Sequence, residues 1–161
     1  MLDVGCGTGE PVSRWLMEQG FAVSGVDFSE AMLTAARSRF PMGDWRLGDM
    51  RTLDLKVRFN GIVGWDSFFH LTPDEQRQCL PKLSSHLVVG GTLLFTVGPD
   101  AGEIEGTVGA DKVYHASLSP AEYAAILEQC GLRLTTFLAE DPDAGGRTIL
   151  MACKQQRIGR D

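Results

Sequence analysis

The stretch "LDVGCGTGE", residues 2–10, determines how the rest of the chain is interpreted. It joins a short apolar run to glycines at positions 5, 7 and 9, with Asp3 before the loop and Glu10 after it. Glycine has no Cβ atom, so the backbone can turn sharply there and approach a ligand closely. A plain turn explains the pattern less well, because three alternating glycines carry a large cost in backbone entropy. The stretch therefore predicts a ligand-binding loop between a strand and a helix.

Beyond this loop, short apolar runs alternate with helical patterns. The runs that predict strands are residues 1–4, 21–27, 45–50, 61–66 and 92–98. Helices are expected to begin at Pro11, after the cap Ser29, and at two capping-box patterns, Thr72 with Glu75 and Ser119 with Glu122.

The last two apolar runs, residues 132–140 and 147–154, flank the turn-rich "DPDAGG" and predict an antiparallel pair. Together the patterns predict an α/β fold: a single-domain, open, mostly parallel twisted sheet with helices on both faces and an antiparallel C-terminal hairpin. Such sheets bind ligands at the carboxyl ends of their strands, where the glycine loop lies.

Composition excludes several classes of function. The 161 residues are expected to form one domain, 1–154, with a polar tail, 155–161. The net charge is −6 and the basic residues are scattered, so nucleic acid is not expected as a partner. There is no signal-peptide pattern and no apolar run near eighteen residues, which predicts a cytoplasmic chain without membrane contact. The four cysteines lie far apart, so neither a metal site nor a disulfide framework is expected.

The charges beside the glycines indicate the kind of ligand. The dinucleotide fingerprint is G-x-G-x-x-G, but Glu10 follows the third glycine here, and Asp3 precedes the loop. Two carboxylates would repel a pyrophosphate, whereas they suit a ligand whose polar end carries an ammonium and a sulfonium. S-adenosylmethionine is such a ligand, and "LDVGCGTG" resembles motif I of the class I, Rossmann-like methyltransferases.

This resemblance implies a set of cofactor-binding residues. Asp27, at the end of the second strand, matches the acid that holds both ribose hydroxyls in that family, and Asp49 matches the acid that accepts the adenine amino group. The full set implied is Asp3, Gly5, Cys6, Gly7, Gly9, Asp27, Phe28, Met32, Asp49, Met50 and Trp65. Taken singly, Asp27 could be a helix N-terminal acid, Asp49 a turn residue and Trp65 a core aromatic.

The chain also departs from the family pattern. Family members usually carry one or two helices before motif I, and residue 1 is here already inside the first strand, so the resemblance implies a fold that lacks the N-terminal cover helices. The sequence "DSFF", residues 66–69, does not match the Asn/Asp-Pro-Pro-aromatic motif of enzymes that methylate DNA bases or glutamine.

Two histidines are the candidate catalytic residues. His70 follows the fourth strand, and an imidazole with an ordinary pKa near ~6.5 suits a general base. His115 lies in the long segment between the fifth strand and Ser119, which is expected to form a hairpin lid around Gly109 and Ala110. A structural histidine bonded to backbone and an idle surface hairpin are the alternatives.

The sequence thus predicts an S-adenosylmethionine-dependent methyltransferase acting on a small molecule. Two other functions stay open: a non-catalytic module that only binds the cofactor, and an NAD-binding oxidoreductase.

Overall fold

The computed structural model describes residues 1–108 and 111–156. In the first half the elements are β1 (Leu2–Val4), α1 (Val12–Glu18), β2 (Ser24–Asp27), α2 (Glu30–Arg39), β3 (Asp44–Leu47), β4 (Phe59–Gly64), η1 (Phe68–His70) and α3 (Pro73–Ser85). In the second half they are β5 (Leu87–Val97), β6 (Gly102–Val108), β7 (Asp111–Ser117), α4 (Pro120–Gln129), β8 (Leu132–Asp141), η2 (Pro142–Ala144) and β9 (Arg147–Lys154).

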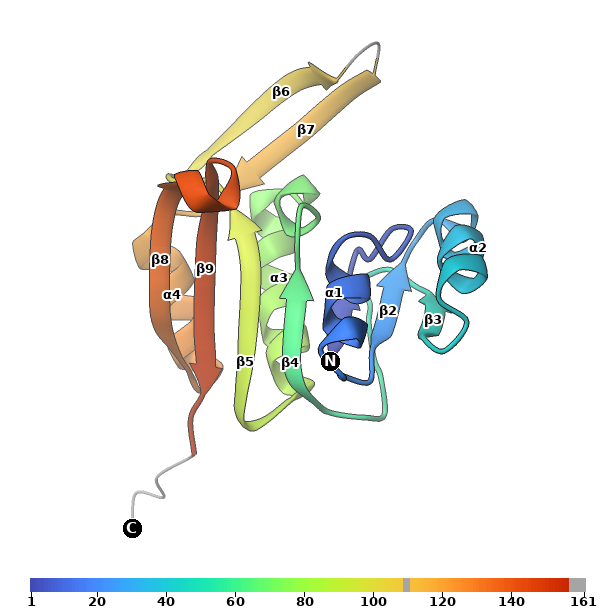
Figure 1. Cartoon of the computed structure of the whole chain (residues 1–161). Coiled ribbons are helices and arrows are strands. Elements are labelled where there is room, and N and C mark those ends of the chain that lie inside the picture. The colour runs from blue at the N-terminus through green and yellow to red at the C-terminus, as the bar shows by residue number, and fades with distance from the viewer. Residues whose placement is uncertain (109–110, 157–161) are drawn as a thin grey trace.

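Seven strands form one twisted sheet in the order β3-β2-β1-β4-β5-β9-β8 (Figure 1). The first five strands in that order are mutually parallel, whereas β9 runs antiparallel to both β5 and β8. The expected fold class is therefore confirmed. Because β1 pairs with β2 on one side and with β4 on the other, the strand order reverses at β1, and the loop after it lies at the switch point where such sheets bind ligands.

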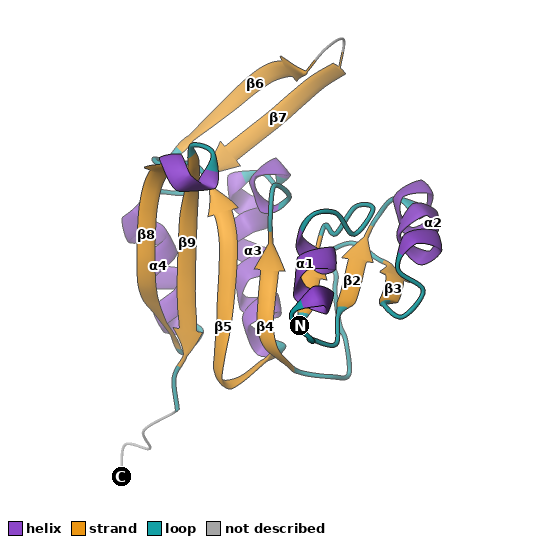
Figure 2. Cartoon of the chain, in the orientation of Figure 1, coloured by secondary structure: helices purple, strands orange, loops and turns teal. Residues whose placement is uncertain are grey.

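Helices cover both faces of the sheet, with α1 on one face and α3 and α4 on the other (Figure 2). Thr72 begins α3 with a complete capping box: its hydroxyl accepts from Glu75 N, and Glu75 Oε2 accepts from Thr72 N. At α4 the Ser119 hydroxyl accepts from Glu122 N as predicted, but the Glu122 carboxylate accepts instead from Arg77 Nε at 2.6 Å. The second capping box is thus only half formed, because an ion pair between α3 and α4 engages its acid.

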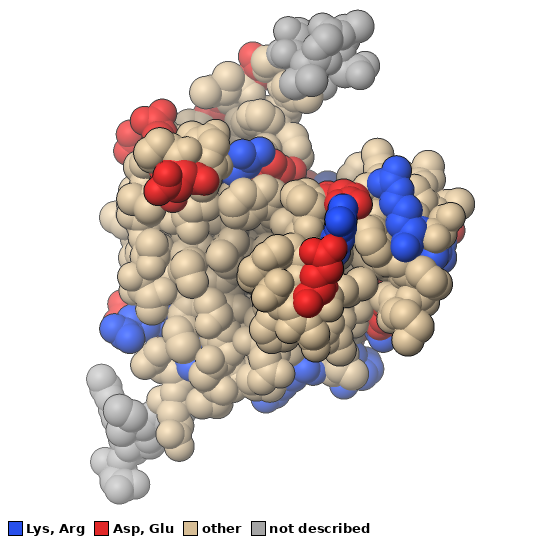
Figure 3. All heavy atoms as spheres, viewed as in Figure 1, with Lys and Arg blue, Asp and Glu red and all other residues tan. Residues whose placement is uncertain are grey.

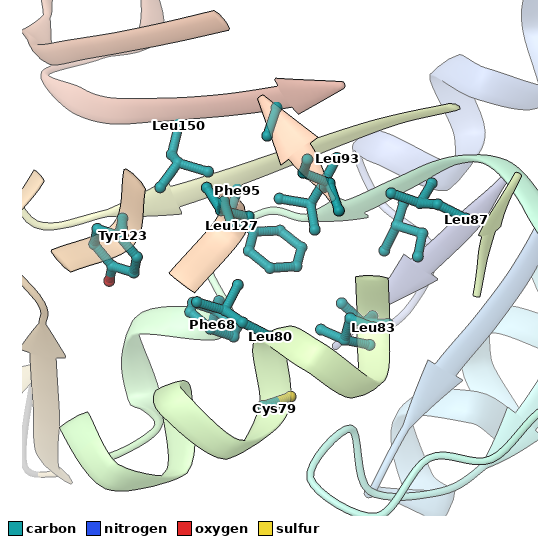
Figure 4. Packing of buried hydrophobic residues seen from close by; sticks show 14 of the residues in the cluster. Phe68, Cys79, Leu80, Leu83, Leu87, Leu93, Phe95, Tyr123, Leu127 and Leu150 are labelled. Carbon is teal, nitrogen blue, oxygen red and sulfur yellow. The ribbon is translucent and has the colours of Figure 1, made fainter. Parts of the chain in front are cut away.

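The main core lies between the sheet and the α3–α4 layer (Figure 4). Phe68 of η1 stacks on Phe95 of β5 with ring centroids 4.5 Å apart, which fixes the segment after β4 against the sheet. Tyr123 of α4 is fully buried, and its hydroxyl donates to Gln76 Oε1 of α3. The Gln76 amide in turn donates to Ala116 O, so this buried network fastens the end of β7 to the helical layer.

Several strand boundaries differ from those predicted. β3 ends at Leu47 rather than at residue 50, and β5 begins at Leu87 rather than at residue 92. β2 begins at Ser24 rather than Phe21, because its partner β1 has three residues and pairs only as far back as Ser24. β4 ends at Gly64, so Trp65 and Asp66 lie in the loop beyond it, where Asp66 has a positive φ of 50°.

The expected hairpin is present as β6 and β7, which project beyond the carboxyl ends of the strands (Figure 1). Its predicted centre, Gly109 and Ala110, lies outside the described residues. Within the described ranges, none of the helices combines the length and the apolar character needed to cross a membrane.

Candidate active site

The glycine loop follows β1 and is hydrogen-bonded to β2. Gly5 N and Cys6 N both donate to Val26 O, at 2.8 and 3.1 Å. All three predicted glycines have positive φ, at 72°, 54° and 81°. A Cβ atom on Gly5 would lie 2.3 Å from Ser67 Cβ, whereas one on Gly7 would meet nothing within 4 Å. Gly5 is therefore required by packing, while Gly7 leaves its side open for a ligand.

Asp27, at the end of β2, faces this loop. Its Oδ2 accepts from Gly7 N at 2.8 Å and its Oδ1 from Ser29 N at 2.9 Å. The residue is buried, with 8% of its surface exposed, yet it lines a cavity of about 360 Å³. Each carboxylate oxygen has a second lone pair, so both can accept a further bond from a ligand.

The cavity next to Asp27 collects residues from the ends of several strands. Of the predicted cofactor residues it is lined by Gly5, Asp27, Phe28, Asp49 and Met50, and its lining also includes Ser67, His70 and Glu75. Phe28 is 82% exposed at the rim. Met32 lies on α2 with 45% of its surface exposed, and the described lining of this cavity does not include it; Leu33 and Ala36 fill the inner side of α2 instead.

Arg51, which sequence reasoning did not single out, holds the Asp49 side of the cavity. Its Nε and Nη2 donate to the Asp49 carboxylate, and its Nη1 donates to Glu75 Oε1 at 2.7 Å. These hydrogen bonds from Arg51 hold the pKa of Asp49 below its ordinary value. The wall of the cavity is thereby connected to the capping box of α3.

A second cavity, of about 210 Å³, shares Gly5 and Asp66 with the first. Asp3, Cys6, Gly7 and Trp65 line it as well, together with Glu10. The carboxylates of Asp3, Glu10 and Asp66 give it a negative lining, which suits a cationic group.

Asp3 is the most buried of these acids, at 3% exposure. Burial raises its pKa to about 6; a hydrogen bond from Ser13 Oγ at 2.6 Å opposes this effect, and the Asp27 carboxylate adds to it.

Cys6 and Trp65 each have a structural contact besides lining the second cavity. Cys6 is buried in a cluster with Leu33, Ala36 and Trp45, and burial raises the pKa of its thiol. Trp65 packs against the cluster of Leu16, Val23 and Val63. Gly9 is also constrained by packing, because a Cβ atom there would lie 2.9 Å from Phe40 Cδ2.

The two candidate catalytic histidines come together although they are far apart in sequence. The ring centroids of His70 and His115 are 5.0 Å apart, and Phe69 contacts both rings edge-on at 4.8 and 4.6 Å. His70 Nδ1 lies 3.0 Å from Tyr114 O of β7, and because a carbonyl oxygen only accepts, Nδ1 carries the proton and Nε2 is the basic nitrogen. Burial lowers the pKa of His115, with a smaller effect from His70 and an opposing one from Asp66.

Asp66 lies where three cavities meet, since it lines the two described above and an open one lined by His70, His115 and Arg147. Arg147 of β9 donates Nε to Asp66 Oδ1 at 2.7 Å and Nη2 to Asp66 Oδ2 at 2.6 Å. Its guanidinium carbon also lies 5.4 Å from the centre of the Trp65 ring. Sequence reasoning did not find Arg147, because nothing local in "GGRTIL" connects that residue with the end of β4.

The chain is similar to known methyltransferases in sequence and in fold. A family model described as "Methyltransferase domain" matches residues 1–91. A dTDP-3-amino-3,4,6-trideoxy-alpha-D-glucopyranose N,N-dimethyltransferase of Streptomyces venezuelae is 35% identical over 96 residues, 58% of this chain and 40% of that protein. The trans-aconitate 2-methyltransferase of Variovorax paradoxus (strain S110) is 33% identical over 103 residues, 62% of this chain and 38% of that protein. The matched part of the chain thus spans about 40% of the length of these curated relatives.

Solved structures show the same fold over nearly the whole chain. An amino pentose methyltransferase of Micromonospora echinaspora with S-adenosylmethionine bound has a TM-score of 0.76 at 23% identity, covering 96% of this chain and 82% of that one. A glycopeptide N-methyltransferase in complex with S-adenosylhomocysteine has a TM-score of 0.76 at 18% identity, covering 95% and 81%.

The sheet order, the glycine loop at its switch point and the acid at the end of β2 define the fold of a class I methyltransferase. The chain belongs to the methyltransferase domain family.

Proposed function

We propose that the chain binds S-adenosylmethionine and transfers its methyl group to a small molecule. The observation that carries this proposal is the pairing of Gly7 with Asp27: a backbone with open space beside it and a buried carboxylate with spare lone pairs, both at the switch point of the sheet. Ribose presents two neighbouring hydroxyl donors, which suit a two-oxygen acceptor such as Asp27.

The remaining cofactor contacts follow from the two connected cavities. Asp49 and Met50 would hold the adenine, and the smaller cavity with Asp3, Glu10 and Asp66 would take the cationic amino-acid end. The lining suits this cofactor better than NAD, because a pyrophosphate would meet the Glu10 and Asp3 carboxylates.

The reaction requires little covalent chemistry from the protein. The bound cofactor supplies a methyl group on a sulfonium that is already primed to leave. The chain's own residues orient the acceptor, exclude water and, if the acceptor must lose a proton, take it up. His70 suits this last task, since its hydrogen bond to Tyr114 O leaves Nε2 as the basic nitrogen. His115 is the second candidate, and the hairpin that carries it would act as the lid over the acceptor.

Two measurements separate this proposal from its alternatives. Mass spectrometry of the denatured purified protein should detect S-adenosylmethionine or S-adenosylhomocysteine, whereas NAD in their place would favour an oxidoreductase. Incubation with cofactor labelled in its methyl group and a panel of small metabolites should then give a labelled product. Tight cofactor binding without transfer to any acceptor would favour a non-catalytic module.

The relatives' names also bear on the acceptor and the compartment. Two curated relatives are named as N,N-dimethyltransferases of amino sugars, which supports a small-molecule acceptor. The four cysteines are free thiols, as is usual in a reducing cytoplasm, and we infer that compartment for the chain.

A further inference from the structure

A fourth cavity, of about 370 Å³, lies at the base of the hairpin and is not needed for the cofactor. Its apolar lining comes from Phe69, Val97, Ala101 and Ile104. It shares Phe69 and His115 with the open cavity that contains His70 and Arg147. A molecule seated there would therefore extend from an apolar chamber toward the histidine pair.

The charges around this chamber have one dominant sign. Asp100 lines it, whereas Glu103 and Glu105 alternate with the lining residues Gly102 and Ile104 along β6 and lie on the opposite face of the hairpin. Acidic side chains also surround the neighbouring η2 turn, at Glu140, Asp141 and Asp143, and Figure 3 shows acidic atoms gathered at this end of the molecule. Among the described lining residues of the two cavities, Arg147 is the only arginine or lysine, and Asp66 binds it through both carboxylate oxygens.

We propose that the methyl acceptor is an amine with an apolar body, which lies in the chamber under the hairpin and presents its nitrogen to His70 and His115. This inference rests on the proposed function. The acidic surroundings attract an ammonium and repel a carboxylate or phosphate, while Phe69, Val97 and Ile104 bury the apolar part of the acceptor.

The histidines complete the chemistry, because an ammonium has no lone pair with which to attack. Neutral imidazole Nε2 takes one proton from R–NH3⁺ and becomes imidazolium. The lone pair of R–NH2 then forms the N–CH3 bond as the S–CH3 bond breaks, and its electron pair stays on sulfur. The products are R–NH2⁺–CH3 and S-adenosylhomocysteine, and the imidazolium releases its proton to water.

The hairpin offers a matched pair of variants. Gly102, Ile104 and Gly106 alternate along β6 and thus share one face of the hairpin, and of these Gly102 and Ile104 line the chamber. A Cβ atom on Gly102 would meet nothing within 4 Å, and one on Gly106 would meet Val113 Cγ2 at 3.7 Å. Gly102→Val therefore narrows the chamber without a clash with protein atoms. Gly106→Val makes the same change on the same strand outside the chamber lining, and it is the control.

The test is calorimetric titration of the chain, saturated with S-adenosylhomocysteine, with benzylammonium, benzyl alcohol, benzoate, methylammonium and glucosamine. We expect benzylammonium to bind roughly tenfold more tightly than each other probe. Gly102→Val should lose this preference, while Gly106→Val keeps it and both variants keep their affinity for S-adenosylhomocysteine.

Three outcomes would overturn the amine proposal: no binding of benzylammonium at millimolar concentration, equal or tighter binding of any other probe, or an unchanged preference in Gly102→Val. All three are distinct from failure of the proposed function, because the affinity for S-adenosylhomocysteine is measured separately and beforehand.

Discussion

Arg147 and Asp66 are 81 residues apart in sequence and form a two-pronged ion pair across the carboxyl edge of the sheet, with N–O distances of 2.7 and 2.6 Å. Asp66 is also held from the other side, since its backbone N donates to Thr96 Oγ1 at 2.8 Å. These contacts maintain Asp66 at a φ of 50°, which non-glycine residues rarely adopt. The residue at the junction of three cavities is thus fixed by β5 and β9 together.

Loss of this ion pair should reduce turnover more than cofactor affinity. Arg147→Ala frees Asp66 and the loop that carries Trp65, so we expect kcat to fall roughly tenfold or more. The free energy of unfolding should fall by only about 1 kcal/mol, because the ion pair is partly exposed. Arg147→Lys should recover part of the rate, since it keeps the charge but not the two-pronged geometry. Arg46→Ala, which removes the exposed pair with Asp44 on β3, is the control. Equal kcat losses in both variants would show that Arg147 does not position the site.

Gly7→Ala should abolish cofactor binding without unfolding the chain. The added methyl group meets no protein atom within 4 Å, so it occupies space that the ligand needs, and the positive φ costs about 1 kcal/mol. Gly131→Ala is matched in both respects, with a φ of 73° and open space, but it lies after α4, away from the cavities. The midpoint temperature of thermal unfolding should fall by a similar amount in the two variants. Only Gly7→Ala should lose its affinity for S-adenosylhomocysteine. Similar ligand affinities would remove this loop from the site.

Asp3→Asn should raise the stability of the chain and weaken its binding of S-adenosylmethionine. Burial raises the pKa of the Asp3 carboxyl from its ordinary value of 3.8 to about 6, so between these values the folded chain holds more protons than the unfolded chain. The free energy of unfolding therefore falls as pH rises through this window. Above the window, the buried carboxylate is ionised and lowers the stability of the folded chain by about 3 kcal/mol. Asn cannot ionise, yet it can still accept from Ser13 Oγ.

Urea unfolding of both proteins at several pH values checks this expectation. The advantage of Asp3→Asn should be largest near pH 7 and should shrink toward about pH 4. Calorimetry on the same samples should show weaker binding of S-adenosylmethionine, because the negative lining has lost a charge. A variant that is less stable at neutral pH, or that binds equally well, contradicts this role for Asp3.

His70→Asn should remove the proton acceptor while roughly keeping the size of the side chain. We expect turnover to fall about 100-fold or more with cofactor affinity intact. His115→Asn should have a smaller effect, because His115 lies on the hairpin whereas His70 is fixed in η1. Full activity in both single variants on an identified acceptor would mean that proximity alone drives the reaction.

The features that the sequence predicted are those coded by local pattern. The glycine loop, the caps Ser29, Thr72 and Ser119 and the alternation of apolar runs each depend on a few neighbouring residues, and they were sufficient to predict the sheet and its ligand edge. The beginning of β2 was misplaced because strand length is set by the partner strand, and "FAV" looks apolar whether or not it is paired.

The features that escaped prediction depend on residues distant in sequence. Arg51 joins Asp49 to Glu75, and Arg147 reaches Asp66, through contacts that no local spacing encodes. The meeting of His70 with His115 depends on how the hairpin folds back over η1, so the sequence could name both histidines without placing them together.

Calorimetric titration with S-adenosylhomocysteine, comparing the unmodified chain with Asp27→Ala, measures whether Asp27 holds the cofactor. Asp27→Asn serves as a milder variant, since Asp27 also accepts from Gly7 N and Ser29 N, and unfolding curves show whether each variant is folded. We predict one binding site in the unmodified chain and a loss of about 2 to 3 kcal/mol in Asp27→Ala, roughly a 30- to 150-fold weaker affinity, because two ligand hydroxyls lose a charged acceptor. An unmodified chain that does not bind S-adenosylhomocysteine would show that this is not a cofactor site, and a folded Asp27→Ala variant that binds it equally well would show that Asp27 does not hold the ribose.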